Sequence, residues 1–493
     1  MRFTTLTFLV FFIAIYIIYW LTPARRRMPL LIVASVAFYA AWSVGFAIHF
    51  VVMVLINYYF IKRLFEKPDK RILWTVLGID LANLFLFKYF YLFLRMLFDI
   101  TGIEILQRDV FNEWMLDKTG VYGILLPLAI SFYTFQLMAF AIDVYRRRIE
   151  EKTPLMEFMV FILFFPQLVA GPIMRHSDFF HQLRNLQPDR DKTLAGMFLL
   201  MLGIIKKVII ADNVSPVIQP VFFNPSAFDW ETNLAAAAGF SVRVYCDFSG
   251  YTDIARGLGN LLGLELPRNF MAPYLATSFR DLWNRWHITL STWIRDYLYI
   301  PLGGSRNAEW RNNFNLVLSF TLAGLWHGAA YQFLMWGAMH GVALAVERQL
   351  RNWRGSIAPR LESLRESSKP LALWLGIWDS GPGVWARRIY MVIFMYALWL
   401  FTAIPFNAPG VPETLAMWKA IFTGQGGERG GGNDYILRMT VLTFIFNWLQ
   451  LKKGGWNVSV RWQYIWAAVL AFVVVILLGR FSPQGVDFIY FQF

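Results

Sequence analysis

Two apolar runs, NFNLVLSFTLAGLW at residues 313–326 and AYQFLMWGAMHGVALAVE at residues 330–347, flank the tripeptide His327-Gly328-Ala329. A helix needs about twenty mostly apolar residues to cross the hydrocarbon core of a bilayer, so both runs are candidates for membrane helices. The glycine after the histidine permits a break or a close approach of the backbone. This stretch therefore predicts a helical membrane protein with an ionisable group between two membrane helices.

The rest of the chain has the same apolar character. Of its 493 residues, 57% are hydrophobic and 16% are charged, whereas soluble globular chains carry about 25% charged residues. Lipid must therefore be the solvent for much of the chain. Further candidate spans are residues 5–22, 28–43, 46–61, 72–96, 120–145, 155–172, 194–211, 233–248, 386–404, 434–451 and 463–480. Because several are short or polar, we expect roughly eleven true crossings. They would form a single all-α, polytopic membrane domain over residues 1–493, with some re-entrant or interfacial helices.

The net charge of +14 is distributed as short basic clusters between the apolar runs. Such clusters are typical of the cytoplasmic loops of membrane proteins, so no nucleic-acid partner is expected. They follow the first, third and fifth spans, at residues 25–27, 62–71 and 146–148. The N-terminus is therefore predicted to lie outside the cytosol, and the loops that follow these three spans are predicted to lie in the cytosol. Five bases between residues 351 and 369 predict a cytosolic loop over residues 346–385, before C-terminal spans in residues 386–493.

A basic segment rich in tryptophan precedes the His327 region. Seven of its side chains recur at the spacing of one helix face, namely Trp283, Trp286, His287, Leu290, Trp293, Ile294 and Tyr297. This spacing predicts one amphipathic helix that lies in the membrane interface or dips partly inward. Its arginines, Arg280, Arg285 and Arg295, either hold the phosphates of a donor such as coenzyme A or only set the topology.

The histidines of these segments are candidates for chemistry. His327 is either a neutral general base or a hydrogen-bonded structural histidine, because a buried imidazole loses its charge. His287 meets His327 if the amphipathic helix dips inward, and otherwise packs beneath its tryptophans. His340 follows His327 by thirteen residues, which is about 20 Å along a continuous helix. We therefore expect His340 to be structural or to line an access path.

A polar run, YCDFSGYTD at residues 245–253, lies at the end of the apolar span 233–248. Its side chains, among them Asp247, Ser249 and Tyr251, either line a tunnel wall or cap a helix end. The single cysteine, Cys246, is expected to be a small buried hydrophobe rather than a nucleophile. The sequence carries no zinc signature, P-loop or Gly-x-Ser-x-Gly elbow, so no metal and no bound cofactor are expected.

These segments together resemble the membrane-bound O-acyltransferase family. The two histidine segments, SFRDLWNRWHITLSTWIRDYLYIPLGGSR at 278–306 and LWHGAAYQFLMWGAMHG at 325–341, carry the resemblance most specifically. The segments that fit the same branch, which acts in bacterial alginate O-acetylation, are YCDFSGYTDIARGLG at 245–259, ISFYTFQLMAFAIDVYR at 130–146, FFPQLVAGPIMR at 164–175 and the tail FIYFQF. The family core spans residues 130–345. Cys246 and Asn284 depart from the alginate pattern, which leaves the particular polysaccharide open.

The resemblance implies a helical body with a central funnel or tunnel, in the bacterial inner membrane. It implies that acetyl-CoA in the cytosol is the acyl donor, a substrate rather than a cofactor. The acceptor is an extracytoplasmic polysaccharide, reached through a separate periplasmic acetyltransferase partner. The family's principal catalytic histidine falls on His327 and its second on His287. The side chains then expected to bind substrate are Trp326, Asp247, Ser249, Tyr251 and the three arginines.

The expected reaction is acyl transfer from a thioester to a hydroxyl, with His327 as the base. Direct transfer is preferred, and a covalent acyl-enzyme on Ser249 or Cys246 is the alternative. Two non-enzymatic functions compete: a transporter or flippase for a glycan precursor, and a scaffold of a polysaccharide export complex. The transporter is disfavoured because intramembrane charges in matched halves are lacking. A scaffold would tolerate the loss of His327.

Overall fold

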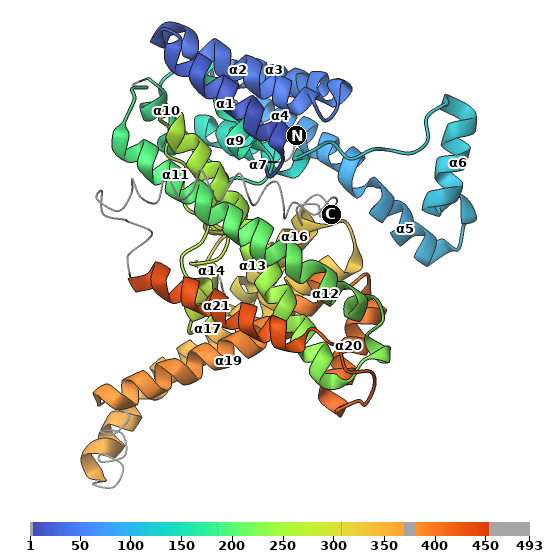
Figure 1. Cartoon of the computed structure of the whole chain (residues 1–493), viewed down its shortest axis with the longest axis vertical. Helices are drawn as coiled ribbons and strands as arrows, with labels where there is room; N and C mark the ends of the chain where they lie inside the picture. Colours follow the sequence, from blue (N-terminus) through green and yellow to red (C-terminus); the bar gives the residue numbers. More distant parts are fainter. Residues whose placement is uncertain (1–2, 185, 307, 369–379, 453–493) are drawn as a thin grey trace. The chain divides into compact units, whose positions relative to one another are not determined.

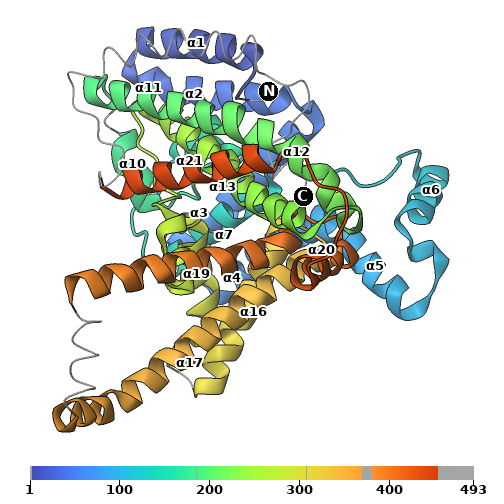
Figure 2. The ribbon, with the colours of Figure 1, turned by 60° about the horizontal axis from the view of Figure 1, so that its bottom comes forward.

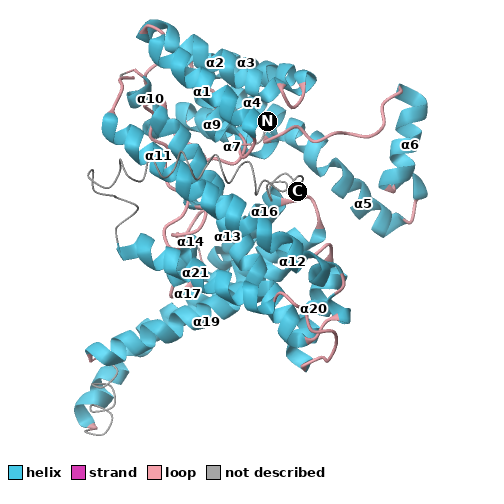
Figure 3. Ribbon diagram, viewed as in Figure 1, coloured by secondary structure: helices cyan, strands magenta, loops and turns pink. Residues whose placement is uncertain are grey.

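The computed structural model describes residues 3–184, 186–306, 308–368 and 380–452. The regular elements among these residues are helices joined by loops (Figure 3), so the predicted all-α membrane fold is confirmed for the described residues. They divide into two compact units. The first holds the residues up to Ile209 together with Asp247–Pro267, and the second holds Ile210–Cys246 and the residues from Arg268 onward.

The first unit begins with a series of apolar helices, labelled in Figure 1. They are α1 (Leu6–Leu21), α2 (Ala24–Ala40), α3 (Val44–Glu66), α4 (Lys70–Leu84), the π-helical turn η1 (Phe85–Tyr89), α5 (Phe90–Thr101), the short η2 (Glu104–Leu106), α6 (Arg108–Thr119), α7 (Ile130–Tyr145), α8 (Leu155–Leu163), α9 (Phe165–Leu168), α10 (His176–Leu183) and α11 (Arg190–Ile204). Aromatic rings fill the space between them. Phe50 of α3, for example, stacks on Tyr133 of α7 with ring centroids 4.4 Å apart.

Among the described residues, four helical stretches are long and apolar enough to cross a bilayer, namely Val44–Glu66, Lys70–Thr101, Arg190–Phe223 and Gly381–Asn407. Leu6–Leu21 and Ile130–Tyr145 are apolar but shorter.

Two of the predicted spans begin or end at other residues than the helices of the structure. The span 120–145 becomes helical only at Ile130, after Pro127, and the span 155–172 breaks at Phe164, just before Pro166. Proline has no backbone N–H to donate within a helix, so it is tolerated in the first turn of a helix and disfavoured in its interior. The predicted span 463–480 lies outside the described residues, and the expected total of crossings stays a prediction.

Helix α13 (Trp230–Leu261) is longer than the predicted span 233–248. In the first unit its residues from Asp247 onward meet α11 through glycines on both helices. A Cβ on Gly196 would lie 2.8 Å from the carbonyl oxygen of Gly257, and a Cβ on Gly203 would lie 2.5 Å from that of Gly250. Only glycine permits such contact, so the two backbones touch. Small residues are the usual means by which membrane helices approach closely.

The second unit holds the segments that carry the histidines. Its elements are α12 (Asp212–Phe223), η4 (Pro225–Ala227), the first part of α13, η5 (Pro273–Leu275), α14 (Phe279–Trp283), α15 (Ile288–Ile294), the π-helical turn η6 (Arg295–Tyr299), α16 (Glu309–His327), α17 (Tyr331–Ser367), α19 (Gly381–Asn407), α20 (Val411–Thr423) and α21 (Asn433–Lys452). The π-helical turn η3 (Ile205–Ala211) joins α11 to α12.

Two predictions about this unit are wrong. The amphipathic segment is not one helix, because Met271 N–H donates to Arg285 O and Ile288 N–H donates to Asn269 O. These bonds use backbone groups that a continuous helix would pair internally. Residues 346–367 are helical rather than a loop, since they continue α17. A helix that has been nucleated propagates at low cost, and Glu347 and Arg351 have a favourable i, i+4 spacing.

Helices α16 and α17 form a hairpin and run side by side (Figure 2). Glycines four residues apart make this contact in both helices. A Cβ on Gly337 would overlap the carbonyl oxygen of Phe320, and a Cβ on Gly341 would lie 2.6 Å from the Cα of Val317. Gly324 and Gly328 are equally crowded, by Phe333. The two runs that flank His327 are therefore folded back on each other at backbone contact.

Candidate active site

His327 is the last residue of α16, and its side chain is buried. Gly328 ends the helix with an extended backbone, and its α-hydrogens face the ring of Phe333 at a distance that leaves no room for a Cβ. The imidazole lies among aromatic rings, with centroids 4.9 Å from Trp326, 5.1 Å from Trp336 and 5.0 Å from Phe406 of α19. This setting excludes bulk water from the imidazole.

His287 lies at the break between α14 and α15. Its backbone is left-handed, with φ 42° and ψ 53°, a conformation that is uncommon and costly for a residue other than glycine. Asn269 holds the break, because its Oδ1 accepts hydrogen bonds from the N–H and the hydroxyl of Thr289. The His287 side chain is fully buried. The break, rather than an amphipathic face, thus turns this imidazole inward.

The structure brings His287 and His327 together. Their ring centroids are 6.3 Å apart, and His287 lies 5.7 Å from Trp326. The sequence left open whether His287 meets His327 or packs beneath the tryptophans. It meets His327, and Trp326 of α16 contacts both imidazoles. Histidine is the side chain most often used for proton transfer in enzymes, so this buried pair is a candidate for that chemistry.

His340 is nearer to this pair than the sequence suggested. The estimate of about 20 Å assumed a continuous helix, but the chain reverses between α16 and α17. Trp336 contacts both His327 and His340, with centroid distances of 5.1 and 4.7 Å. The distance estimate therefore does not apply, and the expectation that His340 is structural or lines an access path stays a prediction.

The predicted substrate contacts on α13 belong to the first unit. Asp247 forms an ion pair with Lys207, with Nζ and Oδ1 2.6 Å apart. Tyr251 stacks on Phe3 at 4.8 Å. The hydroxyl of Ser249 is buried and has no hydrogen-bond partner among the described residues. These residues lie within a helix rather than at its end, so the helix-cap alternative is wrong for them.

Two buried lysines at this place were not predicted as site residues. Lys206 pairs with Asp253 at 2.7 Å and Lys207 pairs with Asp247, and both ammonium groups are almost fully buried. They lie in the π-helical turn η3, a distortion that is frequent at functional sites. The signal was present in the sequence, since two adjacent lysines interrupt the apolar run 194–211. Ionisable groups within a membrane span are costly and mark function or pairing.

Breaking the Lys207–Asp247 pair separates a structural from a substrate-binding role for Asp247. Lys207→Met is expected to destabilise the protein by about 3–5 kcal/mol, because it leaves a buried carboxylate without its cation. The double variant Lys207→Met/Asp247→Leu should recover most of that stability. Thermal unfolding of the purified protein measures the structural role, and the rate of acyl transfer measures the substrate-binding role. Recovery of stability without recovery of transfer would assign substrate contact to Asp247; recovery of both would leave the pair a structural role.

The three arginines of the predicted donor site differ in their surroundings. Arg280 is exposed. Arg285 pairs with Asp281 and Arg295 with Asp296, at 2.6 and 2.7 Å. The two acids neutralise much of the charge that would attract phosphates, so Arg280 is the arginine most available to an anion. Their role in donor binding stays a prediction.

Cys246 is fully buried, and its Sγ lies 3.9 Å from the hydroxyl oxygen of Thr443. This burial agrees with the hydrophobic role expected for the cysteine. The described residues contain no group of three or more His, Cys, Asp or Glu side chains that would suit a metal ion.

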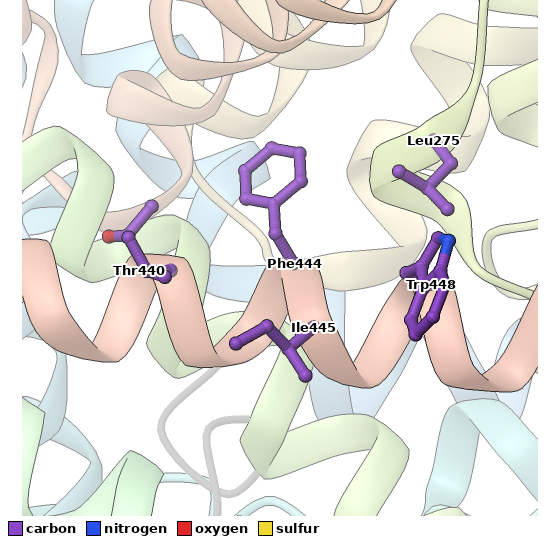
Figure 4. Close-up of a pocket in the computed structure, with 6 residues that line it drawn as sticks. Leu275, Thr440, Phe444, Ile445 and Trp448 are labelled. Atoms are coloured by element: carbon purple, nitrogen blue, oxygen red, sulfur yellow. The ribbon is translucent and has the colours of Figure 1, made fainter.

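An open groove of about 470 Å³ lies in the second unit. Figure 4 shows its lining by side chains of α21 and by Leu275 of η5. The lining residues are Leu275, Thr440, Val441, Phe444, Ile445 and Trp448. None of them titrates near neutral pH, so this groove suits hydrocarbon and cannot supply a general base. The cluster of aromatic rings around His287 and His327 is the better candidate for chemistry.

Comparisons with known proteins show the family of the chain. A family model described as MBOAT, membrane-bound O-acyltransferase family, matches residues 145–378, which include both histidines. The probable alginate O-acetylase of Pseudomonas putida is 39% identical over 71% of this chain and 71% of its own length. That of Azotobacter vinelandii is 38% identical over 71% and 69%. The peptidoglycan O-acetyltransferase of Helicobacter pylori is 36% identical over 67% of each chain.

Proposed function

The chain belongs to the membrane-bound O-acyltransferase family and is an acyltransferase, and from that premise we propose that it acetylates an extracytoplasmic polysaccharide. The donor is acetyl-CoA in the cytosol, and the acetyl group crosses the membrane through this protein in the bacterial inner membrane. A separate periplasmic acetyltransferase completes transfer to the sugar hydroxyl. The names of the relatives support an acetyl group and a polysaccharide acceptor, since they include alginate and peptidoglycan O-acetylases.

The observation that carries the proposal is the pair of buried imidazoles 6.3 Å apart. A hydroxyl is a poor nucleophile until a base takes its proton in the transition state. His327 takes that proton as the hydroxyl oxygen forms a bond to the thioester carbonyl carbon. The carbon–sulfur bond then breaks, and the proton passes to the departing thiolate of coenzyme A. His287 orients the donor or the base. A positioned histidine contributes about 10²–10⁴-fold to such a step.

Sealed membrane vesicles of defined orientation test the proposal. Inverted vesicles, whose cytosolic face is outside, are incubated with acetyl-CoA that carries a radioactive acetyl group. Label should accumulate as base-labile ester on the polysaccharide or the partner protein inside the vesicles. Right-side-out vesicles should accumulate none, because acetyl-CoA does not cross the membrane.

Two outcomes would contradict this proposal. Equal labelling in both orientations would mean that the donor is not taken from the cytosolic face. Labelling in membranes that lack this protein would mean that another protein carries the transfer. Export of unacetylated glycan that depends on the protein, without any ester, would instead support the alternative of a transporter or flippase.

A further inference from the structure

His340 has an unusual setting for a purely structural histidine. Its side chain is fully buried in α17, and neither ring nitrogen has a hydrogen-bond partner among the described residues. Aromatic rings surround it, with centroids 4.7 Å away for Trp336, 5.4 Å for Trp283, 5.7 Å for Phe279 and 6.0 Å for Trp399. The indole N–H of Trp283 is also buried without a partner among these residues.

An imidazole in this state is costly to the folded protein. A buried polar group without a hydrogen bond has lost its hydrogen bonds to water without a replacement, whereas an apolar group of similar shape would be neutral or stabilising. If His340 served only to fill space between aromatic rings, a leucine or phenylalanine would do so better. The cost is accounted for if a bound molecule supplies the missing hydrogen bond.

The hairpin places His340 close enough to act on the same molecule as His327. Since each imidazole lies about 5 Å from the indole of Trp336, the two rings are at most about 10 Å apart. In such a reaction centre the base lies beside the attacking oxygen, this oxygen lies beside the carbonyl carbon, and a hydrogen-bond donor lies beside the carbonyl oxygen. Each step is a hydrogen-bond or covalent distance of about 3 Å or less. Two imidazoles at this separation can therefore flank one thioester.

We propose that His340 contacts the acyl donor and donates a hydrogen bond from a ring N–H to the thioester carbonyl oxygen. The inference rests on the proposed function, in which His327 removes the proton of the acceptor hydroxyl. As the carbon–oxygen bond forms, negative charge develops on the carbonyl oxygen, and the neutral imidazole of His340 stabilises it without losing its proton. When the carbon–sulfur bond breaks, the charge leaves with the thiolate, which takes the proton from His327.

The test compares three substitutions with different hydrogen-bonding ability. His340→Leu and His340→Phe keep the pocket apolar and filled, and are expected to leave thermal stability equal or higher. They should lower kcat by about 10²–10³-fold, the usual effect of removing one such donor, while the KM for acetyl-CoA changes less than about threefold. His340→Gln can still donate a hydrogen bond and should recover at least tenfold in kcat over His340→Leu.

The matched control is His181→Ala, because His181 is an exposed histidine of α10 and should be silent. Turnover of a folded His340→Leu or His340→Phe within threefold of the parent would overturn the proposal. Failure of both apolar variants to give monodisperse protein, or activity in His340→Gln no higher than in His340→Leu, would assign a structural role instead. A different result would contradict the proposed function itself, namely full acyl transfer by the His327→Ala variant.

Discussion

Replacing His327 by alanine is expected to leave a folded, membrane-inserted protein that has lost nearly all acyl transfer. The imidazole sits in an aromatic pocket at the end of α16, and its removal takes away the base that accepts the hydroxyl proton. The loss should reach about 10²–10⁴-fold. His327→Gln should be about as inactive, because a carboxamide donates and accepts hydrogen bonds but takes up no proton at neutral pH.

The measurement is the O-acetyl content of the product polysaccharide, with the membrane level of each variant held equal by immunoblot. His287→Ala should cost less than His327→Ala if His287 only orients the donor or the base. His181→Ala again serves as the silent control. Near-normal acetylation in His327→Gln would rule out proton abstraction there, and normal acetylation in His327→Ala would favour a scaffold.

A methyl group on Gly337 is expected to disrupt the hairpin that forms the pocket. The new Cβ would overlap the carbonyl oxygen of Phe320 and lie 2.9 Å from the Cα of Thr321. Backbone atoms cannot rotate away as a side chain can, so α16 and α17 must separate. Overpacking costs about 1–3 kcal/mol and sometimes more. Because Trp336 and His340 flank this glycine, Gly337→Ala should lower transfer as well as thermal stability.

The same helix provides a matched control. Gly355 lies in the exposed continuation of α17, and a Cβ there would meet nothing within 4 Å. Gly355→Ala should raise stability slightly, by up to about 1 kcal/mol, because alanine is the better helix former. Thermal unfolding of the detergent-purified variants measures both changes. If Gly337→Ala unfolds at the parent temperature and keeps full transfer, the close contact of the two helices is not needed for the site.

The membrane character of the chain and its central histidine were readable from residue types alone. Apolar runs near bilayer length, few charges and basic clusters predict spans because the bilayer imposes the same demand on any sequence. His327 stood out for the same reason, since an ionisable side chain between two apolar runs is costly unless it is used. Helical spacing placed His287 on the apolar face of its segment and left its contact with His327 open, and the family resemblance added its catalytic role.

Helix limits were less predictable. The periodic side chains of residues 283–297 suggested one helix. The backbone hydrogen bonds that this segment forms with residues 269 and 271 instead break it at His287. Polar residues 346–367 suggested a loop, yet they extend a helix that is nucleated by its buried part. Both errors have one cause. Local pattern reports the preference of a segment, while partners distant in the sequence decide which backbone hydrogen bonds form.

The sequence by itself determined that this protein is a helical membrane acyltransferase with a histidine between two apolar runs, because hydrophobicity, charge and a local motif are properties of neighbouring residues. The tertiary structure alone decided which other groups share the pocket. His340 lies beside Trp336 and near His327 because glycines on α16 and α17 let the backbones touch, and Lys207 meets Asp247 from a different helix. Such proximity depends on how the chain reverses and on what each helix contacts, and residue spacing along the chain does not contain that information.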